Sequence, residues 1–490
     1  MPGEKPVIRV LFAVSEADPF IKVGGLADVA GSLPYSLQAL RAEHGLPHLE
    51  IRLIMPYHPA MRSRVPKPRL LAKFWLQRDG GDMPVHVYQI KHKGLTIYLV
   101  DGPPISQEFA VYTGDLKKDG EKYTFFSLSL LELVDLIGWK PDILHAHDWH
   151  ACPAVYQLSQ WRTTHDFFKD CRSLLTIHNL PYMGFDSEEA LMAYGISPSH
   201  NPDLPYWARL LPLPMGLESA DFINAVSPSY SREIMTDAYG CGLEGFLQSR
   251  SATITGILNG IDLDCWNPVN DKALQVNFDA DKLDHRKANK KALQAEFNLP
   301  ISADLPLIIM VGRLDRQKGI DLAIESLNQI NNLPWQAIVL GTGDPNLEAA
   351  CRILEQEFPE RIRAAIRFDG DLARRMYAGG DILLMPSRYE PCGLAQMIAM
   401  HYGCIPLARA TGGLKDSIVD NEDISQATGF LFEEPTVDSM VALLQKALTT
   451  YDNPSIWKAM QINGMKRDFS WAKSAKEYRN IYMKLKGLTP

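Results

Sequence analysis

Residues 386–394, Pro-Ser-Arg-Tyr-Glu-Pro-Cys-Gly-Leu, place a carboxylate between a short apolar run and a helical segment. The apolar run, residues 381–385, has the pattern of a buried strand, and residues 395–402 favour a helix. Glu390 is therefore expected at the carboxyl end of a parallel strand, the edge where open α/β sheets bind ligands. The helix start offers unpaired N–H groups that suit a phosphate. A lone glutamate at this position would also be typical of a helix cap.

Two basic residues follow another apolar run. Residues 307–312 form an expected strand, and Arg313 and Lys318 lie in the loop behind it, on the edge that also carries Glu390. Arginine presents a planar fork to phosphate oxygens, and lysine presents a point charge. Residues 411–414, Thr-Gly-Gly-Leu, again stand between an apolar strand and a helix. A solvated basic loop would have the same composition, but here several strand ends bring glycines, two cations and a carboxylate to one edge.

The N-terminal part of the chain has a similar arrangement. Residues 7–14 form the first expected strand, and the loop behind it holds Lys22 beside the pair Gly24 and Gly25. This loop matches neither a Walker loop nor Gly-x-Gly-x-x-Gly, so it provides no dinucleotide fingerprint. Paired glycines let a backbone approach a ligand closely, although a plain turn with a solvated lysine has the same pattern.

Histidines and an aspartate end two further strands of this part. Residues 142–150 contain three histidines and Asp148, and residues 174–179 end in His178 and Asn179. The His-x-His step puts two histidines on one face of a strand, as a metal site would, but no Cys or Glu cluster completes such a site. Asp148 and His178 are expected at the same sheet edge as Lys22. Two edges of this kind, facing each other, would suit a ligand that has both a diphosphate and a polyol.

The elements that position these residues form two successive β/α alternations. Residues 70–100 are predicted to form hairpins inserted in the first sheet or at its edge, and residues 252–258 to form the last strand of that sheet. The polar segment 263–304, with a helix over 287–297, separates the two runs. The pattern predicts an α/β protein with two doubly wound domains and parallel sheets. Long helices are expected over 123–137 and 471–486.

Bulk properties exclude several classes. The 490 residues are too many for one core, and 46% hydrophobic with 22% charged residues is ordinary for a globular protein. The net charge of −8 argues against a nucleic-acid partner. The seven cysteines have no metal or disulfide spacing, which favours a reduced environment. No apolar run is long enough to span a membrane, and the strand near residue 7 leaves no room for a signal peptide.

Several motifs together resemble the bacterial glycogen synthases and plant-type starch synthases. Lys22 to Val29, with the sequence Lys-Val-Gly-Gly-Leu-Ala-Asp-Val, is similar to the N-terminal signature of that family. The resemblance extends, in order, from about residue 7 to residue 482. The other motifs that carry it are His-Ala-His-Asp-Trp-His-Ala at 145–151, Thr-Ile-His-Asn at 176–179, Asn-Gly-Ile-Asp at 259–262, Val-Gly-Arg-Leu at 311–314, Glu-Pro-Cys-Gly-Leu at 390–394 and Thr-Gly-Gly-Leu at 411–414.

The resemblance implies a GT-B fold, in which two Rossmann-like domains face each other across a deep cleft. The implied bounds are 1–265 for the N-terminal, acceptor-side domain, with helix 471–490 crossing back onto it, and 266–470 for the nucleotide-sugar domain. The implied reaction transfers glucose from ADP-glucose to the non-reducing end of an α-1,4-glucan, with retention of configuration and release of ADP. A cytoplasmic location is implied for a bacterial protein, and the plastid stroma for a plastid protein whose transit peptide has been removed.

Site residues follow from the resemblance position by position. Catalytic roles would fall to Glu390, His178, Lys318, Arg313 and Asp148. Glu390 would lie beside the donor glucose, and Asp148 near the acceptor. The residues expected to bind ADP-glucose are Lys22, Gly24, Gly25, Arg313, Lys318, Phe368, Glu390, Cys392, Gly393, Leu394, Thr411 and Gly412. No metal or other cofactor is expected, because cationic side chains can take a metal's place, and the sequence does not determine the oligomeric state.

The chain departs from the family pattern around the expected pockets. Pro214 to Leu217, Pro-Met-Gly-Leu, replaces a Lys-x-Gly-Gly-(Ile/Leu) sequence, and Ala395 stands where Thr or Asn is usual. Arg367 replaces an uncharged residue beside the nucleobase, and residues 370–375 are also unusual. These changes leave nucleotide preference and primer length open. They do not affect the expected catalytic residues, so an active enzyme is still predicted.

Three alternative functions have to be compared with a glucan synthase. A GT-B transferase with another acceptor would share the donor site and differ only in the acceptor. A non-catalytic glucan-binding scaffold would need aromatic residues, but has no need of Arg313, Lys318 and Glu390 together. A phosphorylase is disfavoured because the sequence has no recognisable pyridoxal-phosphate lysine context.

Overall fold

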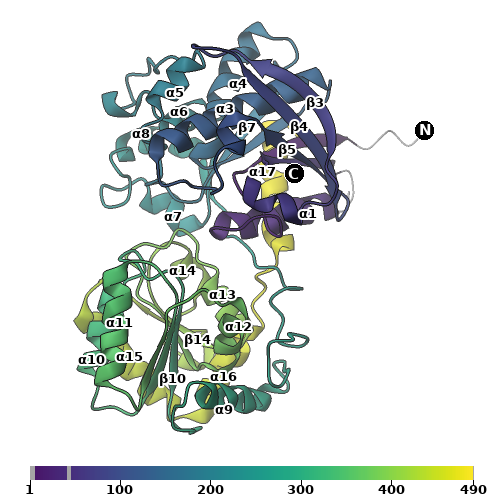
Figure 1. Ribbon diagram of the computed structural model, residues 1–490. Helices are drawn as coiled ribbons and strands as arrows, with labels where there is room; N and C mark the ends of the chain where they lie inside the picture. The colour runs from purple at the N-terminus through teal and green to yellow at the C-terminus, as the bar shows by residue number, and fades with distance from the viewer. Residues whose placement is uncertain (1–5, 41–45, 489–490) are drawn as a thin grey trace. The chain divides into compact units, whose positions relative to one another are not determined.

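The computed structural model describes residues 6–40 and 46–488, and the chain divides into two compact units. Unit 1 comprises residues 1–260 and 471–490, and unit 2 comprises residues 261–470. The first division thus falls five residues before the predicted boundary at 265. Figure 1 shows an α/β architecture in each unit. None of the described helices is long and apolar enough to cross a membrane.

Unit 1 is built on a nine-stranded sheet with the order β3-β4-β5-β2-β1-β6-β7-β8-β9. The strands from β5 to β9 in this order pair in parallel, whereas β3, β4 and β5 form the antiparallel hairpins predicted for residues 70–100. The strands are β1 Val7–Ala13, β2 His48–Pro56, β3 Arg69–Leu76, β4 Met83–His92, β5 Leu95–Asp101, β6 Ile143–His147, β7 Arg172–Ile177, β8 Phe222–Ala225 and β9 Ile254–Gly256.

The helices of unit 1 lie between these strands, with one returning from the end of the chain. They are α1 Gly25–Ala39, α2 Pro103–Ser106, α3 Leu116–Leu136, α4 Cys152–Thr164, α5 Glu188–Ala193, α6 Pro212–Ser219, α7 Pro228–Glu233, α8 Glu244–Ser249 and α17 Trp471–Leu485. The helix predicted from residue 123 begins seven residues earlier, because the Asp115 carboxylate caps it by accepting from the backbone N–H of Lys117 and Lys118. The last strand was predicted too long, since residues 251–253 form a 3₁₀ turn.

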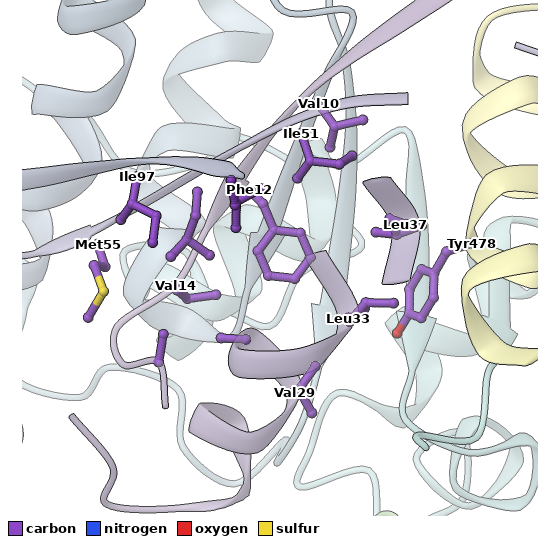
Figure 2. Close-up of a cluster of buried hydrophobic side chains, with 14 of the residues drawn as sticks. Val10, Phe12, Val14, Val29, Leu33, Leu37, Ile51, Met55, Ile97 and Tyr478 are labelled. Atoms are coloured by element: carbon purple, nitrogen blue, oxygen red, sulfur yellow. The ribbon is translucent and has the colours of Figure 1, made fainter. Parts of the chain in front are cut away.

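The final helix α17 belongs to the core of unit 1. Its residues Trp471, Tyr478 and Tyr482 join the buried cluster formed by β1, β2, β5 and α1. Figure 2 shows Tyr478 beside Leu33 and Leu37 of α1. The apolar face of α17 therefore packs against α1, the first helix of the chain. Nearly the whole sequence separates these two helices.

Unit 2 is a six-stranded parallel sheet with the order β12-β11-β10-β13-β14-β15. In the order along the chain this is the 3-2-1-4-5-6 arrangement of a Rossmann fold. Figure 1 shows α10, α11 and α15 on one face of this sheet, with α9, α12, α13 and α16 on the other. The strands are β10 Leu307–Val311, β11 Gln336–Leu340, β12 Ile362–Ala365, β13 Ile382–Met385, β14 Ile405–Arg409 and β15 Phe430–Phe432. The helices are α9 Arg286–Glu296, α10 Ile320–Gln329, α11 Pro345–Glu357, α12 Gly370–Gly379, α13 Ala395–His401, α14 Gly412–Ser417, α15 Val437–Tyr451 and α16 Pro454–Met465.

Candidate active site

The strand order of unit 2 fixes where its ligand site must lie. Strands β10 and β13 are neighbours in the sheet, although β11 and β12 come between them in the sequence. The chain therefore leaves β10 and β13 toward opposite sides of the sheet, and a crevice opens between the two loops at their carboxyl ends. Arg313 and Lys318 follow β10, and Glu390 follows β13. The topology thus confirms that these three residues share one sheet edge.

Lys318 and Glu390 are in direct contact at this edge. The Lys318 Nζ lies 2.8 Å from Glu390 Oε1 and 2.6 Å from Oε2. The Glu390 carboxylate also accepts a hydrogen bond of 3.0 Å from the hydroxyl of Ser387. Glu390 is only 5% exposed, whereas a quarter of the Lys318 side chain is open. A buried carboxylate is thus held by one ammonium and one hydroxyl.

A glycine allows the two loops to come this close. Gly319 has a φ of +70°, and a Cβ placed on it would lie 2.1 Å from the carbonyl oxygen of Pro386. A larger residue would push the loop behind β10 away from the loop behind β13. Gly319 therefore sets the distance between Lys318 and Glu390.

Arg313 lies at the more open side of the same loop. Its guanidinium contacts Asp315 at 3.0 Å and donates to the side chain of Gln317 at 3.1 Å. The Asp315 carboxylate also accepts the backbone N–H of Lys318 at 2.9 Å. More than half of the Arg313 side chain is exposed. The fork is therefore oriented by its neighbours and still accessible to an anion.

Arg388 ties the loop behind β13 to the helix behind β10. Its guanidinium makes two parallel hydrogen bonds to the carboxylate of Asp321 in α10, at 2.7 and 2.8 Å. Its backbone N–H donates to the carbonyl of Gln317 at 2.7 Å. This bidentate geometry is more specific than a point-charge contact. It holds the segment that carries Glu390 in a defined position.

The glycine pair at 412–413 packs under Glu390. Gly412 has a φ of +44°, and a Cβ on it would lie 2.0 Å from the carbonyl oxygen of Glu390. The backbone N–H of Gly413 donates to that same oxygen at 3.1 Å. Thr411, directly before this pair, is 1% exposed. The predicted residues of this loop therefore support the backbone around Glu390.

The other residues of unit 2 that were predicted to bind ADP-glucose differ in their surroundings. Cys392 is buried, and Leu394 directly precedes α13. Gly393 has a φ of +71°, which suits the turn predicted there. Phe368 follows the edge strand β12 and is 91% exposed, so this unit leaves its ring uncovered. The neighbouring Arg367 pairs with Asp369 at 3.2 Å.

Unit 1 has its own switch point, between β1 and β6. Asp148 follows β6 and adopts a φ of +54°, which is rare outside glycine. Its carboxylate accepts the backbone N–H of His178 at 2.6 Å and that of Asn179 at 3.4 Å. Burial raises the pKa of Asp148 to about 7, despite these two hydrogen bonds. Asp148 and His178 thus lie together at the carboxyl ends of β6 and β7, as predicted.

His145, His147 and His178, at the ends of β6 and β7, hydrogen-bond to neighbouring side chains. His147 Nδ1 lies 2.9 Å from His178 Nε2. His145 Nδ1 lies 2.8 Å from the hydroxyl of Tyr482, and its Nε2 lies 2.8 Å from that of Thr176. Burial lowers the pKa of His178 to about 3 and the pKa of His147 well below its ordinary value. Both rings are therefore neutral near pH 7 and act as hydrogen-bonding groups rather than as cations.

The loop behind β1 differs in one respect from the sequence-based expectation. Lys22 contacts Asp28 of α1 at 2.5 Å and remains partly exposed. The backbone N–H of Gly24, expected to face a ligand, instead donates to the carboxylate of Glu16 at 3.2 Å. Sequence reasoning passed over Glu16 and Ser387. Both residues could have been found from the sequence, because each is a polar residue shortly after an apolar strand, at the same sheet edge as the motifs.

The chain is similar to several known proteins. Residues 9–249 match the model of the starch synthase catalytic domain, and residues 293–462 match that of the glycosyl transferases group 1. The chain is 37% identical to a glycogen synthase of Clostridium perfringens over 488 residues, covering 98% of both chains. It is 37% identical to a glycogen synthase of Lactiplantibacillus plantarum, covering 97% of this chain and 99% of that relative.

Solved structures give the same result. The catalytic domain of starch synthase IV from Arabidopsis thaliana, bound to ADP and acarbose, matches 98% of this chain and all of its own length, with a TM-score of 0.88 and 30% identity. A sucrose-phosphate synthase from Thermosynechococcus elongatus matches with a TM-score of 0.62 and 19% identity, and this likeness concerns the fold alone. The fold is therefore GT-B, as predicted, and the chain belongs to the glycogen and starch synthase family of glycosyltransferases.

Proposed function

We propose that this enzyme transfers glucose from ADP-glucose to the non-reducing end of an α-1,4-glucan, with retention of the α configuration and release of ADP. The observation that carries the proposal is the group Arg313, Lys318 and Glu390 at the switch point of unit 2. Two cations and a buried carboxylate at one sheet edge suit a donor that joins a diphosphate to a sugar. The glycogen synthase relatives support a glucan as the acceptor.

The cations address the charge that develops during the reaction. The leaving group is a nucleoside diphosphate, whose negative charge grows as the glycosidic bond breaks. Fixed cations that already face this position stabilise the charge without reorganising. Arg313 would bind two phosphate oxygens through its fork, and Lys318 would contribute a point charge. We propose that these side chains make a metal ion unnecessary, so added chelator should not reduce the rate.

The carboxylate and the neutral histidine would act on the sugar. Glu390 would order the glucose hydroxyls or stabilise positive charge at the reacting carbon. His178, neutral because burial lowers its pKa to about 3, would hydrogen-bond the glucose rather than contribute charge. We favour a same-face mechanism in which a leaving phosphate oxygen helps to deprotonate the acceptor hydroxyl. The new bond then forms on the face from which ADP departs, and the configuration is retained.

Aromatic side chains a few residues after His178 in the sequence support a sugar chain as the acceptor. Tyr182 and Phe185 lie in the loop behind β7 and are 54% and 45% exposed. Gly184 between them has a φ of +81°, and a Cβ on it would lie 2.7 Å from both Pro212 and Trp149, so the loop is closely packed. Exposed aromatic rings suit the apolar faces of sugars. These two rings would bind glucose units of the acceptor.

The proposal is tested by incorporation of radiolabelled glucose into glycogen and maltooligosaccharides, with ADP-glucose compared with UDP-glucose. The products are then digested with a glucanase specific for α-1,4 bonds. Label from ADP-glucose that is lost on digestion is the expected result. A preference for UDP-glucose would refute the donor and point to Arg367 and Phe368 as an altered base site. Label on another acceptor only, or glucan binding without any transfer, would refute the proposal in favour of a different transferase or a scaffold.

A further inference from the structure

Glu16 is a buried carboxylate that the proposed reaction does not use. It follows β1, two residues before the turn at Asp18, and is only 1% exposed. Its two oxygens accept the backbone N–H of Val23 at 2.5 Å and the backbone N–H of Gly24 at 3.2 Å. The hydroxyl of Tyr112 donates to it at 3.2 Å. Three donors from two segments of the chain therefore converge on one side chain.

Contacts elsewhere in the chain hold Tyr112 toward Glu16. The Tyr112 hydroxyl also hydrogen-bonds the hydroxyl of Ser15 at 3.0 Å. The carbonyl of Val111, directly before Tyr112, accepts from the Lys122 ammonium and from the Tyr123 hydroxyl of α3, at 2.7 Å each. Glu16 is thus anchored to α3 on one side and to the glycine loop on the other.

A carboxylate in this position depends on the loop as much as the loop depends on it. Burying an ionised carboxylate without partners costs several kcal/mol. Among the ion pairs of the described residues, none includes Glu16, so its charge is compensated by N–H and O–H dipoles. Burial raises the pKa of Glu16, while the Val23 and Gly24 amides lower it again. The loop conformation in which both amides point inward is therefore the one that stabilises the carboxylate.

This conformation determines which groups of the loop can meet a ligand. The amides of Val23 and Gly24 are occupied by Glu16 and are not available to a phosphate. Gly25 begins α1, and a Cβ built on it would meet no atom within 4 Å. Its backbone therefore has open space beside it. Lys22, whose side chain is 41% exposed, also lies on the accessible side.

We propose that Glu16 is the positioning residue of the glycine loop, which it holds so that Lys22 and the backbone of Gly25 meet the diphosphate of the donor. The identity of the ligand in this inference rests on the proposed function. The role of Glu16 in holding the loop conformation does not. Glu16 itself touches no substrate. It acts through Val23 and Gly24, and its loss should affect the donor more than the glucan.

The test compares Glu16→Gln with Glu50→Gln in the full chain. Glutamine keeps the size of the side chain but replaces one acceptor oxygen with an NH2 group. This group would face an N–H or O–H donor that now bonds to the carboxylate. Glu50 is a matched control, because it also lies in unit 1 and accepts from Arg52 at 2.8 Å and Trp139 at 2.9 Å. It sits near the start of β2, at the opposite sheet edge from the glycine loop.

The first readout is hydrogen exchange of the peptide that covers residues 21–25, without any ligand. Exchange is expected to accelerate in Glu16→Gln and to remain at the wild-type rate in Glu50→Gln. The second readout is steady-state kinetics. The KM for ADP-glucose should rise about tenfold in Glu16→Gln, the loss expected for one charge-assisted contact, with the KM for glycogen unchanged. Glu50→Gln should leave both KM values unchanged.

Wild-type exchange in Glu16→Gln would overturn the proposal, and so would equal rises of both KM values. If the wild-type enzyme does not use ADP-glucose, the proposed function fails, and the exchange result alone decides whether Glu16 positions the loop. If Glu16→Gln does not fold, Glu16→Asp replaces it, since the charge is kept and only the reach to Val23 and Gly24 is shortened. Partial acceleration of hydrogen exchange in Glu16→Asp would support the proposal. Exchange at the wild-type rate in that variant would refute it.

Discussion

Lys318 Nζ lies within 2.8 Å of both carboxylate oxygens of Glu390, although the two residues are 72 positions apart in the chain. The two strands that bring them together, β10 and β13, are neighbours only because the chain returns to the centre of the sheet after β12. The cation proposed for the donor diphosphate is thus already paired with the carboxylate proposed for the sugar. A diphosphate that binds here has to share or replace that pairing.

Glu390→Gln should therefore separate binding from turnover. The substitution removes the competing negative charge beside Lys318, so the affinity for ADP should be equal to or higher than that of the wild type. The turnover number should fall by about 100-fold or more, the range found when one fixed electrostatic group of an active site is removed. Calorimetry with ADP and glucose incorporation measure the two effects. Weaker ADP binding would contradict the idea that the pair competes with the donor.

Lys318→Ala should weaken ADP binding by about 1.5–3 kcal/mol, or roughly 10- to 150-fold, through loss of a charge-assisted phosphate contact. It also leaves Glu390 buried without its cation, which adds repulsion toward the diphosphate. The double variant with Glu390→Gln should recover part of the loss. Lys446→Ala is the control, because Lys446 is half exposed and pairs only loosely with Asp420, at 3.7 Å. Equal ADP affinities of wild type and Lys318→Ala would mean that Lys318 is an ordinary loop residue that does not bind the phosphate.

The sequence was sufficient for the edge on which the site residues lie, but not for their contacts. Apolar runs followed by Lys318 and Glu390 predicted two strands and the loops behind them, because strand and turn patterns are local. The contact between the two side chains depends on how closely the loops cross. That distance is set by Gly319, whose missing Cβ lets the Pro386 carbonyl approach. The sequence shows the glycine at this position but does not show which distant residue packs against it.

The first domain shows the same limit. The pair Gly24 and Gly25 predicts a close approach of backbone to ligand, but the sequence does not distinguish the two glycines. The structure separates them, because Glu16 accepts the N–H of Gly24 while Gly25 begins a helix beside open space. Glu16 gave no motif of its own, since a single acidic residue behind a strand is usually a solvated loop residue. Its role becomes visible only when Tyr112, almost a hundred residues away, is seen beside it.

The contact of α17 with β6 should contribute measurably to stability. The Tyr482 hydroxyl bonds to Nδ1 of His145, and both side chains are fully buried. Tyr482→Phe would leave a buried ring nitrogen without a partner, at a cost of about 1–3 kcal/mol. Urea denaturation should show this loss, with both KM values unchanged. Tyr88→Phe is the control, because the Tyr88 hydroxyl makes no hydrogen bond within the described part of the chain and its side chain is partly exposed. Equal stability of both variants would mean that packing alone holds α17.

Asp148 should make the stability depend on pH near neutrality. Burial raises its pKa from 3.8 to about 7 in the folded protein. Between these two values the folded protein keeps a proton that the unfolded chain has released, so through this group the free energy of unfolding falls as the pH rises. Asp148→Asn removes the effect, because the amide oxygen still accepts the N–H of His178 and cannot ionise.

The free energy of unfolding of both proteins should therefore be compared at pH 5 and pH 8. Going from pH 5 to pH 8, the wild type should lose stability relative to Asp148→Asn, whatever other groups titrate in both proteins. A constant difference between the two proteins would mean that Asp148 has an ordinary pKa. If Asp148 also contacts the acceptor, the variant should raise the KM for glycogen more than the KM for ADP-glucose. The two measurements are independent, because the first concerns the proton on the carboxyl group and the second concerns the glucan that it would face.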